Sequence, residues 1–238
     1  MPVEARRHFH DELDAIHGDL VRLAALVIEA IPRGTQALLD GDLAAAQSLI
    51  DADDELDDLA LHVEERCYKQ LALQQPMAGD MRALVTAIRL TAELERSGDL
   101  MVNVAKGARR IYGLTIGPKV RGLLQMMSDE ALRLFRHALE AYADADEAKA
   151  TALDDMDDTL DGIHRDYIAA VLEACRADTL DIQAAVQLAL IGRYYERIGD
   201  HAVNVGERVR YMVSGWLPPH HRRGRTDQQP DDEAGWPS

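Results

Sequence analysis

The motif ELERSGDLMVNVA occupies residues 93–105, and a close copy, YYERIGDHAVNVG, occupies residues 194–206. At a constant offset of 101, the Glu, Arg, Gly, Asp and Val-Asn-Val positions of the two copies coincide. The Glu, Asp and Asn of each copy stand at i, i+4 and i+8, so a helix would place them along one face. The motif therefore predicts a helix, present twice, that carries a column of oxygen donors.

The acids of the motif continue the apolar face of their helix. In the first copy this face is formed by Met81, Leu84, Val85, Ile88 and Ala92. The same helical spacing then reaches Glu95 and Asp99, and in the second copy it leads from Ile182 to Glu196 and Asp200. A carboxylate that leaves water needs a cation, hydrogen bonds or a metal ion as its partner. We therefore expect these acids to have such partners.

The composition favours packed helices. Hydrophobic residues fill 47% of the 238 positions and aromatic residues only 5%, so the core is expected to consist of Ala, Leu, Val and Ile. Helical periodicity predicts an all-α fold of six long helices. Their expected ranges are residues 6–39 with a break or kink near Pro32, the turn at 40–42 to 74, 81–112 after a cap at Asp80, 119–142, the turn at 143–146 to 175, and 180–213 after a cap at Asp178. The last three helices repeat the first three, which indicates two tandem three-helix bundles.

The duplication adds a second set of acids. Asp53 and Asp57 lie at i and i+4 on the second helix, and an offset of 104 pairs them with Asp157 and Asp161. Both pairs lie on the apolar face of a helix that a short turn joins to the motif helix. If the pairs meet across the groove between these helices, each half of the chain holds four carboxylates.

Four carboxylates in one site repel one another unless a positive charge joins them. A divalent or trivalent metal ion supplies that charge, and oxygen donors without Cys or His favour Mg²⁺, Mn²⁺ or Fe over zinc. Two alternatives stay open: Arg96 and Arg197 could neutralise the acids, or the acids could be solvated. Asn103 and Asn204 could be neutral ligands or could orient a carboxylate, and they could equally satisfy interhelical contacts.

Several features of the sequence limit the possible functions and location of the protein. Lys and Arg number 26 against 42 Asp and Glu, and the formal charge of −16 argues against nucleic-acid binding. The first residues lack the apolar segment of a secretory signal and no uncharged run is long enough to span a bilayer, so we expect a soluble cytoplasmic protein.

Cys67 and Cys175 are interpreted as small buried thiols of a reducing compartment. We expect residues 216–238 to form a disordered tail, and we assign no specific partner to residues 220–223 within it.

The two motif copies, the run LALQQPMAGDMRALVTAIRLTAELERSGDLMVNVA and the DxxxD pairs together resemble the PhoU family of phosphate-transport accessory proteins, from about Arg6 to Val213. The resemblance implies PhoU-like three-helix bundles over residues 1–114 and 115–215, with surface metal clusters held by paired E/DxxxD motifs. By position, the first cluster would use Asp53, Asp57, Glu95 and Asp99, and the second Asp157, Asp161, Glu196 and Asp200. The chain departs from the usual motif at Ser97, where a branched apolar residue is expected, and extra acids stand beside the pairs at Asp54, Asp58 and Asp158.

The same resemblance implies a regulatory function. It implies negative regulation of the phosphate-starvation response through the ATPase of the Pst phosphate ABC transporter and a PhoR-type sensor histidine kinase. It also implies a homodimer that does not insert into the membrane and associates peripherally with membrane complexes through these partners.

No P-loop or GxSxG motif is visible, so we do not expect an enzyme. One other interpretation is a carboxylate-bridged metal oxidase of the ferritin-like kind, which needs His ligands on more than one helix. Asp161 and His164 form one DxxH, but Ala60 replaces this histidine in the first half, which disfavours the oxidase. The remaining interpretation is a purely structural helical scaffold whose acids are solvated.

Overall fold

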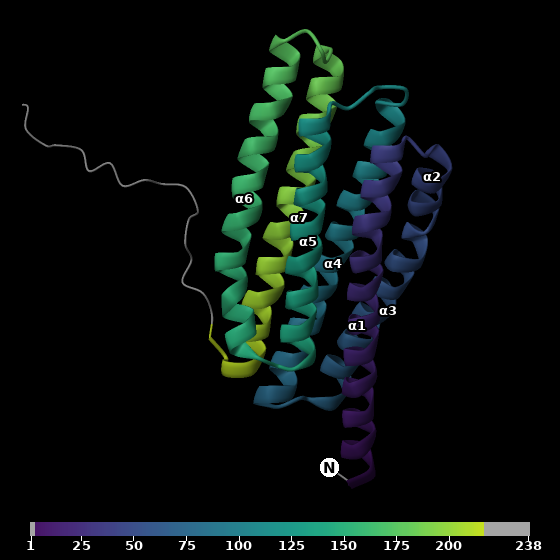
Figure 1. The fold of residues 1–238 in the computed structure, drawn as a ribbon. Helices are drawn as coiled ribbons and strands as arrows, with labels where there is room; N and C mark the ends of the chain where they lie inside the picture. The colour runs from purple at the N-terminus through teal and green to yellow at the C-terminus, as the bar shows by residue number, and fades with distance from the viewer. Residues whose placement is uncertain (1–2, 217–238) are drawn as a thin grey trace, which may run out of the picture.

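The computed structural model describes residues 3–216, so the tail expected after residue 216, including residues 220–223, lies outside the described residues. Within residues 3–216 the chain forms helices and no strand (Figure 1). The helices are α1 (Val3–Asp40), α2 (Leu43–Asp51), α3 (Asp53–Gln74), α4 (Ala78–Arg110), α5 (Pro118–Ala143), α6 (Glu147–Arg176) and α7 (Ile182–Ser214). The predicted all-α fold is confirmed.

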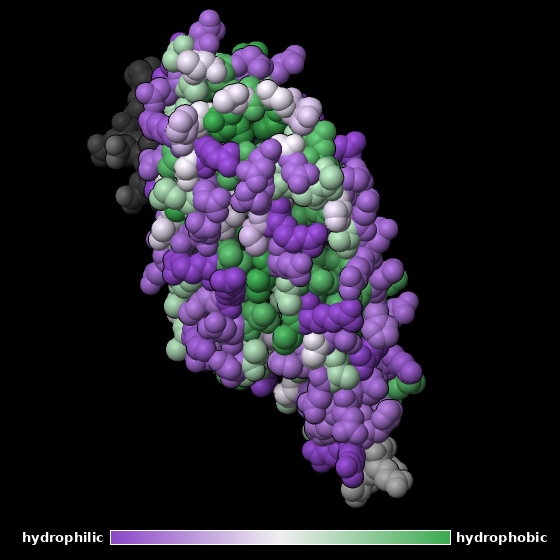
Figure 2. Space-filling model, turned by 45° about the vertical axis from the view of Figure 1, so that its right-hand side comes forward, coloured by the Kyte–Doolittle hydropathy of each residue, from purple (hydrophilic) through white to green (hydrophobic). Residues whose placement is uncertain are grey.

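The helices form an elongated bundle in which both halves of the chain contribute to one core. The two motif helices, α4 and α7, pack against each other and run in opposite directions, and α1 packs against α5 (Figure 1). Their hairpin partners α3 and α6 lie at opposite sides of the bundle. The buried side chains are mostly Ala, Leu, Val and Ile, as the composition predicts. The face in Figure 2 is mostly hydrophilic, with hydrophobic side chains in smaller patches.

Equivalent aspartates begin equivalent helices. Asp42 caps α2, and its counterpart at an offset of 104, Asp146, caps α6; each side chain accepts hydrogen bonds from two backbone N–H groups of the first turn. The preceding residues, Gly41 and Ala145, both adopt positive φ angles, of 65° and 50°. The two halves therefore repeat this turn as well as the motif.

The first two predicted helices differ from those observed. α1 is not broken at Pro32, because Ile31 before it and Ala37 and Leu38 after it are all buried in the same core. The second expected helix is two helices, α2 and α3, that meet at Ala52. The first turn of α3 consists of acids, which suit the positive end of a helix dipole better than a helix interior.

Two predicted caps were wrong. Asp80 lies inside the first turn of α4, where its N–H already bonds to the carbonyl of Met77. Asp178 has a φ of 57° and lies in the turn after α6, where its N–H bonds to the carbonyl of Cys175. The residue that caps α7 is Asp181, whose side chain accepts two backbone hydrogen bonds of the first turn.

Candidate functional site

Acids from α3 and α4 form the first acidic cluster, which we define as Asp53, Asp57, Glu95 and Asp99. The two helices approach closely at Gly98, where an added Cβ would lie 2.7 Å from Cδ1 of Leu56 and 3.6 Å from Oδ1 of Asp53. The recurring glycine of the motif thus allows the two helices to approach closely. This approach brings the carboxylates of the two helices within range of each other's charges.

Burial and neighbouring carboxylates raise the pKa values of Asp53, Asp57 and Glu95 in the first acidic cluster. Partial burial, followed by the charges of Asp57 and Asp99, raises the pKa of Asp53 to about 6 against the opposing charge of a nearby lysine. Burial and neighbouring carboxylates also raise the pKa of Asp57 and of Glu95, and Arg96 offsets this rise at Glu95 only in part. The positive charges nearby therefore do not offset the combined effect of burial and neighbouring carboxylates at these residues.

The second acidic cluster, which we define as Asp157, Asp161, Glu196 and Asp200, lies in a groove of about 560 Å³ between α6 and α7. The same groove is lined by Asp154, Asp155 and Asp158. The groove also contains Arg193, which forms an ion pair with Glu196, whereas the counterpart of Arg193 in the first half is Ala92. The second acidic cluster thus has an arginine at a position where the first acidic cluster has an alanine.

Gly199 gives the second acidic cluster the close helix approach that Gly98 gives the first. An added Cβ at Gly199 would lie 2.5 Å from Oδ1 of Asp157 and 2.6 Å from Cδ2 of Leu160. Real Cβ atoms are essentially never found so close to other heavy atoms, so a side chain here would displace α6 or its carboxylate. The glycine therefore fixes how near the acids of α6 lie to α7.

Both acidic clusters fit a hard cation by the chemistry of their donors. Each offers carboxylate oxygens as donors, and in the first acidic cluster burial and then neighbouring carboxylates raise the pKa values of Asp53, Asp57 and Glu95, which a bound cation would oppose. The side chains are not arranged as metal ligands. Across residues 3–216, no three His, Cys, Asp or Glu side chains form a group that could hold a metal ion. The metal assignment stays a prediction that rests on donor type and charge.

A buried polar contact joins α4 to α7. Nδ1 of His201 lies 2.6 Å from Oε2 of Glu93, and Nδ2 of Asn204 donates to the same oxygen at 3.0 Å. Burial raises the pKa of Glu93, but the hydrogen bonds from His201 and Asn204 and the charge of Arg96 outweigh burial and leave it below its ordinary value. Asn204 therefore makes an interhelical contact, while Asn103 lies half-buried at the equivalent place on α4.

Sequence reasoning assigned no role to Glu93 or His201. A comparison that keeps only residues shared by the two repeats does not select either of them, because their counterparts at an offset of 101 are Tyr194 and Leu100. The available signal was a charged or ionisable residue at a buried helical position that differs between the two copies. Of the two cysteines, Cys67 is buried as expected, and burial raises the pKa of its thiol to about 12, whereas Cys175 is only partly buried.

The chain matches known proteins over most of its length. The family model described as "PhoU domain" matches residues 20–108 and 124–209. The chain is 36% identical over 214 residues to "Phosphate-specific transport system accessory protein PhoU homolog 1" of Mycobacterium tuberculosis strain H37Rv, which covers 90% of this chain and 96% of that protein. It is 32% identical over 214 residues to the PhoU homologue of Rhizobium meliloti, covering 90% of each.

The fold is similar to a solved structure. The crystal structure of PhoU from Pseudomonas aeruginosa superimposes with a TM-score of 0.82 and 28% sequence identity, covering 87% of this chain and 100% of that one. In the part of the chain from residue 3 to residue 216, none of the helices has the length and apolar character needed to cross a membrane.

Proposed function

The chain belongs to the PhoU family, and from that premise we propose that it is an accessory protein of a phosphate transport system and a negative regulator of the phosphate-starvation response. The observation that supports this most directly is the match of both repeats, residues 20–108 and 124–209, to the PhoU domain. The relatives from M. tuberculosis and R. meliloti carry the name phosphate-specific transport system accessory protein. The proposed function is regulatory and requires no catalytic residue.

The proposed partners are the ATPase of a Pst phosphate ABC transporter and a PhoR-type sensor histidine kinase, contacted by a homodimer of this chain. The charge of −16 supports partners with basic surfaces, because complementary charge steers association and like charge disfavours it. The position of the protein would then be peripheral, at the cytoplasmic side of membrane complexes.

The two acidic clusters are proposed to hold Mg²⁺, Mn²⁺ or Fe. Asp53, Asp57, Glu95 and Asp99 would bind one ion or cluster, and Asp157, Asp161, Glu196 and Asp200 another. A bound cation supplies positive charge that lets the carboxylates stay ionised together. The chain's own contribution is the spacing at Gly98 and Gly199, which brings the acids of neighbouring helices together.

A phosphate-responsive reporter in phosphate-rich medium tests the regulatory function. A strain that lacks the gene is restored with wild type, with Asp99→Asn plus Asp200→Asn, or with Glu65→Gln plus Asp166→Asn. The last pair is a matched control, because it removes two exposed charges from α3 and α6 outside the acidic clusters. We expect derepression on deletion, and repression restored by wild type and by the control but not by the cluster variant.

Each other outcome removes a different part of the proposal. If the cluster variant restores repression as well as wild type does, the acidic clusters are not part of signalling. If deletion leaves the reporter silent, the phosphate function itself is wrong. A purely structural scaffold predicts this second result.

A further inference from the structure

The hairpin of α3 and α4 carries apolar side chains on its outer face. Leu61 and Tyr68 of α3 lie two helical turns apart and have 57% and 53% of their surfaces exposed. On α4, Met81 is 40% exposed, and Val85 and Ile88 on the same face are half-buried. We call these five side chains the apolar strip. Among residues 3–216, α3 packs only against α1, α2 and α4, so no described helix covers the strip (Figure 1).

The apolar strip continues into the first acidic cluster. Because α3 and α4 are antiparallel and joined by a short turn, residues equally far from the turn lie side by side. Leu61 therefore lies level with residues 88–92, and Asp57 lies level with Glu95, whose carboxylate its charge reaches. The strip and the cluster together extend over residues 81–99 of α4, a length of about 27 Å. The outer face is thus apolar near the turn and acidic beyond it.

The first acidic cluster has no ion pair of its own. None of the ion pairs found within residues 3–216 includes a member of the cluster. Arg96 lies 3.9 Å from a carboxylate oxygen of Glu93, and Arg89 lies six residues before Glu95 on α4. A divalent metal ion would offset only two of the four carboxylate charges. The face therefore stays acidic with or without a metal ion.

The second half of the chain differs where the apolar and acidic parts meet. Leu61 corresponds to Arg165 at the offset of 104, and Ala92 corresponds to Arg193 at the offset of 101. Arg193 lines the groove of the second acidic cluster and pairs with Glu196. The second half thus supplies arginines at two positions where the first half has small or apolar side chains.

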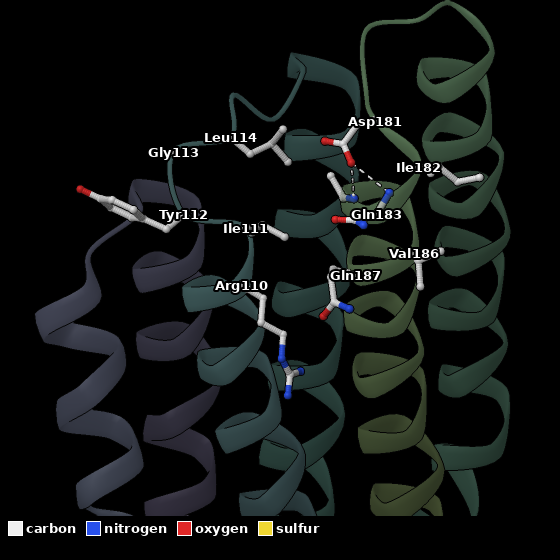
Figure 3. Close-up of a pocket in the computed structure, with 11 residues that line it drawn as sticks. Arg110, Ile111, Tyr112, Gly113, Leu114, Asp181, Ile182, Gln183, Val186 and Gln187 are labelled. Atoms are coloured by element: carbon white, nitrogen blue, oxygen red, sulfur yellow. Dashed lines mark hydrogen bonds between the residues drawn. The ribbon is translucent and has the colours of Figure 1, made fainter.

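The apolar parts of the two hairpins are alike. Tyr68 and Met81 correspond to Leu172 and Ile182, which are 49% and 72% exposed. Ile182 and Val186 line a groove of about 660 Å³ at the end of the bundle, and Figure 3 shows both at one edge of it. Exposed apolar surface is therefore common to both halves, whereas the arginines beside the acids are not.

We propose that the outer face of α3 and α4 binds an amphipathic helix of another protein, whose apolar side covers the apolar strip and whose Lys or Arg side chains lie over the first acidic cluster. Apolar side chains two turns apart on neighbouring helices are suited to receive the apolar face of a helix. The partner's cations would take the places that Arg165 and Arg193 hold in the second half. The inference rests on the proposed function, because it names the surface on which a basic partner binds.

Charge argues against a second copy of this chain as the occupant. Each copy carries a charge of −16, and the hairpin of α6 and α7 also presents an acidic groove. Two such faces in contact would place carboxylates against carboxylates. A separate protein with a basic helix avoids this repulsion.

Binding of a synthetic peptide to the full-length chain tests the proposal. The probe is a helical peptide of about 18 residues, which matches the length of the face, with leucines along one side and lysines in its last two turns. Its fluorescence anisotropy is followed in the presence of a chelator, and we expect one peptide per chain. Tyr68→Asp plus Met81→Asp should weaken binding at least about tenfold. The equivalent pair in the second half, Leu172→Asp plus Ile182→Asp, should change binding less than about twofold.

Both pairs of substitutions add two negative charges, which separates charge from apolar contact. A peptide held by charge alone would bind more tightly to Tyr68→Asp plus Met81→Asp, and that result would overturn the proposal. A second peptide has glutamates in place of the lysines and should bind at least about tenfold more weakly. Equal binding of the two peptides would show that the acidic cluster plays no part and would also overturn it.

Exchange of the arginines between the halves gives an independent test. Leu61→Arg should weaken binding of the lysine peptide at least about fivefold, and it should leave the fold intact because Leu61 is 57% exposed. Arg165→Leu plus Arg193→Ala should raise the number of peptides bound per chain from one to two. Unchanged binding in both variants would contradict the role given to these positions.

Two further results separate this inference from the proposed function and from self-association. Peptide binding as expected, with a reporter that stays silent on deletion, would retain the surface and remove the phosphate function. No peptide binding, with a reporter that is derepressed on deletion, would retain the function and overturn the surface. Sedimentation in which Leu61→Arg converts a dimer into a monomer would assign the face to a second copy and overturn the proposal.

Discussion

Nδ1 of His201 lies 2.6 Å from Oε2 of Glu93, so a buried hydrogen bond ties the second copy of the motif to the first. Only 8% of Glu93 and 7% of His201 are exposed to solvent. A buried carboxylate with two donors is costly to disrupt, because the donors that remain lose their partner without regaining water. The contact thus couples the packing of α4 and α7 to the pairing of specific polar groups.

Glu93→Ala is expected to lower the free energy of unfolding by about 2–4 kcal/mol, because it leaves His201 and Asn204 without their shared acceptor. Glu93→Gln keeps an acceptor oxygen and should cost less. Urea unfolding monitored by circular dichroism measures both variants. Equal stability of Glu93→Ala and wild type would show that the contact contributes nothing to the joining of the two halves.

Regular spacing made the fold and the acidic clusters predictable. Asp53, Asp57, Glu95 and Asp99 continue apolar helical faces, and the offsets of 101 and 104 place their counterparts in the second half. The structure brings each group of four to one pair of antiparallel helices. The recurrence of glycine at residues 98 and 199 is a further sequence signal of close helix packing, because glycine inside a helix is unfavourable without a packing reason.

Contacts that break the repeat were not predictable. Glu93 and His201 meet because α4 packs antiparallel to α7, and nothing in either helix alone specifies that register. Arg193 pairs with Glu196, but its counterpart in the first half is Ala92. Comparison of the two repeats therefore gives no signal for this ion pair. Pro32 was overestimated as a helix breaker, because burial on both sides of it outweighs one missing hydrogen bond.

Gly199→Ala should destabilise the protein by about 1–3 kcal/mol, because the new Cβ would lie within 2.6 Å of Asp157 and Leu160 on α6. Gly122→Ala is the matched control: Gly122 lies in α5 with no heavy atom within 4 Å of an added Cβ. It should stabilise the protein by about 0.5–1 kcal/mol through helix propensity. Thermal unfolding compares the two, and a Gly199→Ala variant as stable as Gly122→Ala would contradict the close approach of α6 and α7.

Asp53→Asn should stabilise the metal-free protein at pH 7.5 and change little at pH 4. The folded pKa of Asp53, about 6, lies above the ordinary value of 3.8, so the folded state binds more protons than the unfolded state between these values. Stability therefore falls as the pH rises from about 4 through 6. Because Asp53 is partly exposed, solvent screening reduces the effect to about 1 kcal/mol.

Urea unfolding at the two pH values, in the presence of a chelator, measures this difference for Asp53→Asn. Asp54→Asn serves as the control, since it removes an exposed carboxylate from the same turn. A gain in stability that is equal for both variants would assign the effect to net charge rather than to the environment of Asp53.

Mn²⁺ binding should depend on pH and on the acids of the first cluster. The raised pKa values of Asp53, Asp57 and Glu95 mean that protons compete with a metal ion, so we expect binding at pH 7.5 to weaken as the pH falls through about 6. Electron paramagnetic resonance of free Mn²⁺ measures the number of ions bound per chain. Asp57→Asn plus Asp99→Asn should remove the share of the first acidic cluster, whereas Glu65→Gln plus Asp166→Asn should leave binding unchanged. If the cluster variant binds as much Mn²⁺ as wild type at pH 7.5, these carboxylates are not the ligands. Their repulsion must then be relieved by protons or by a partner.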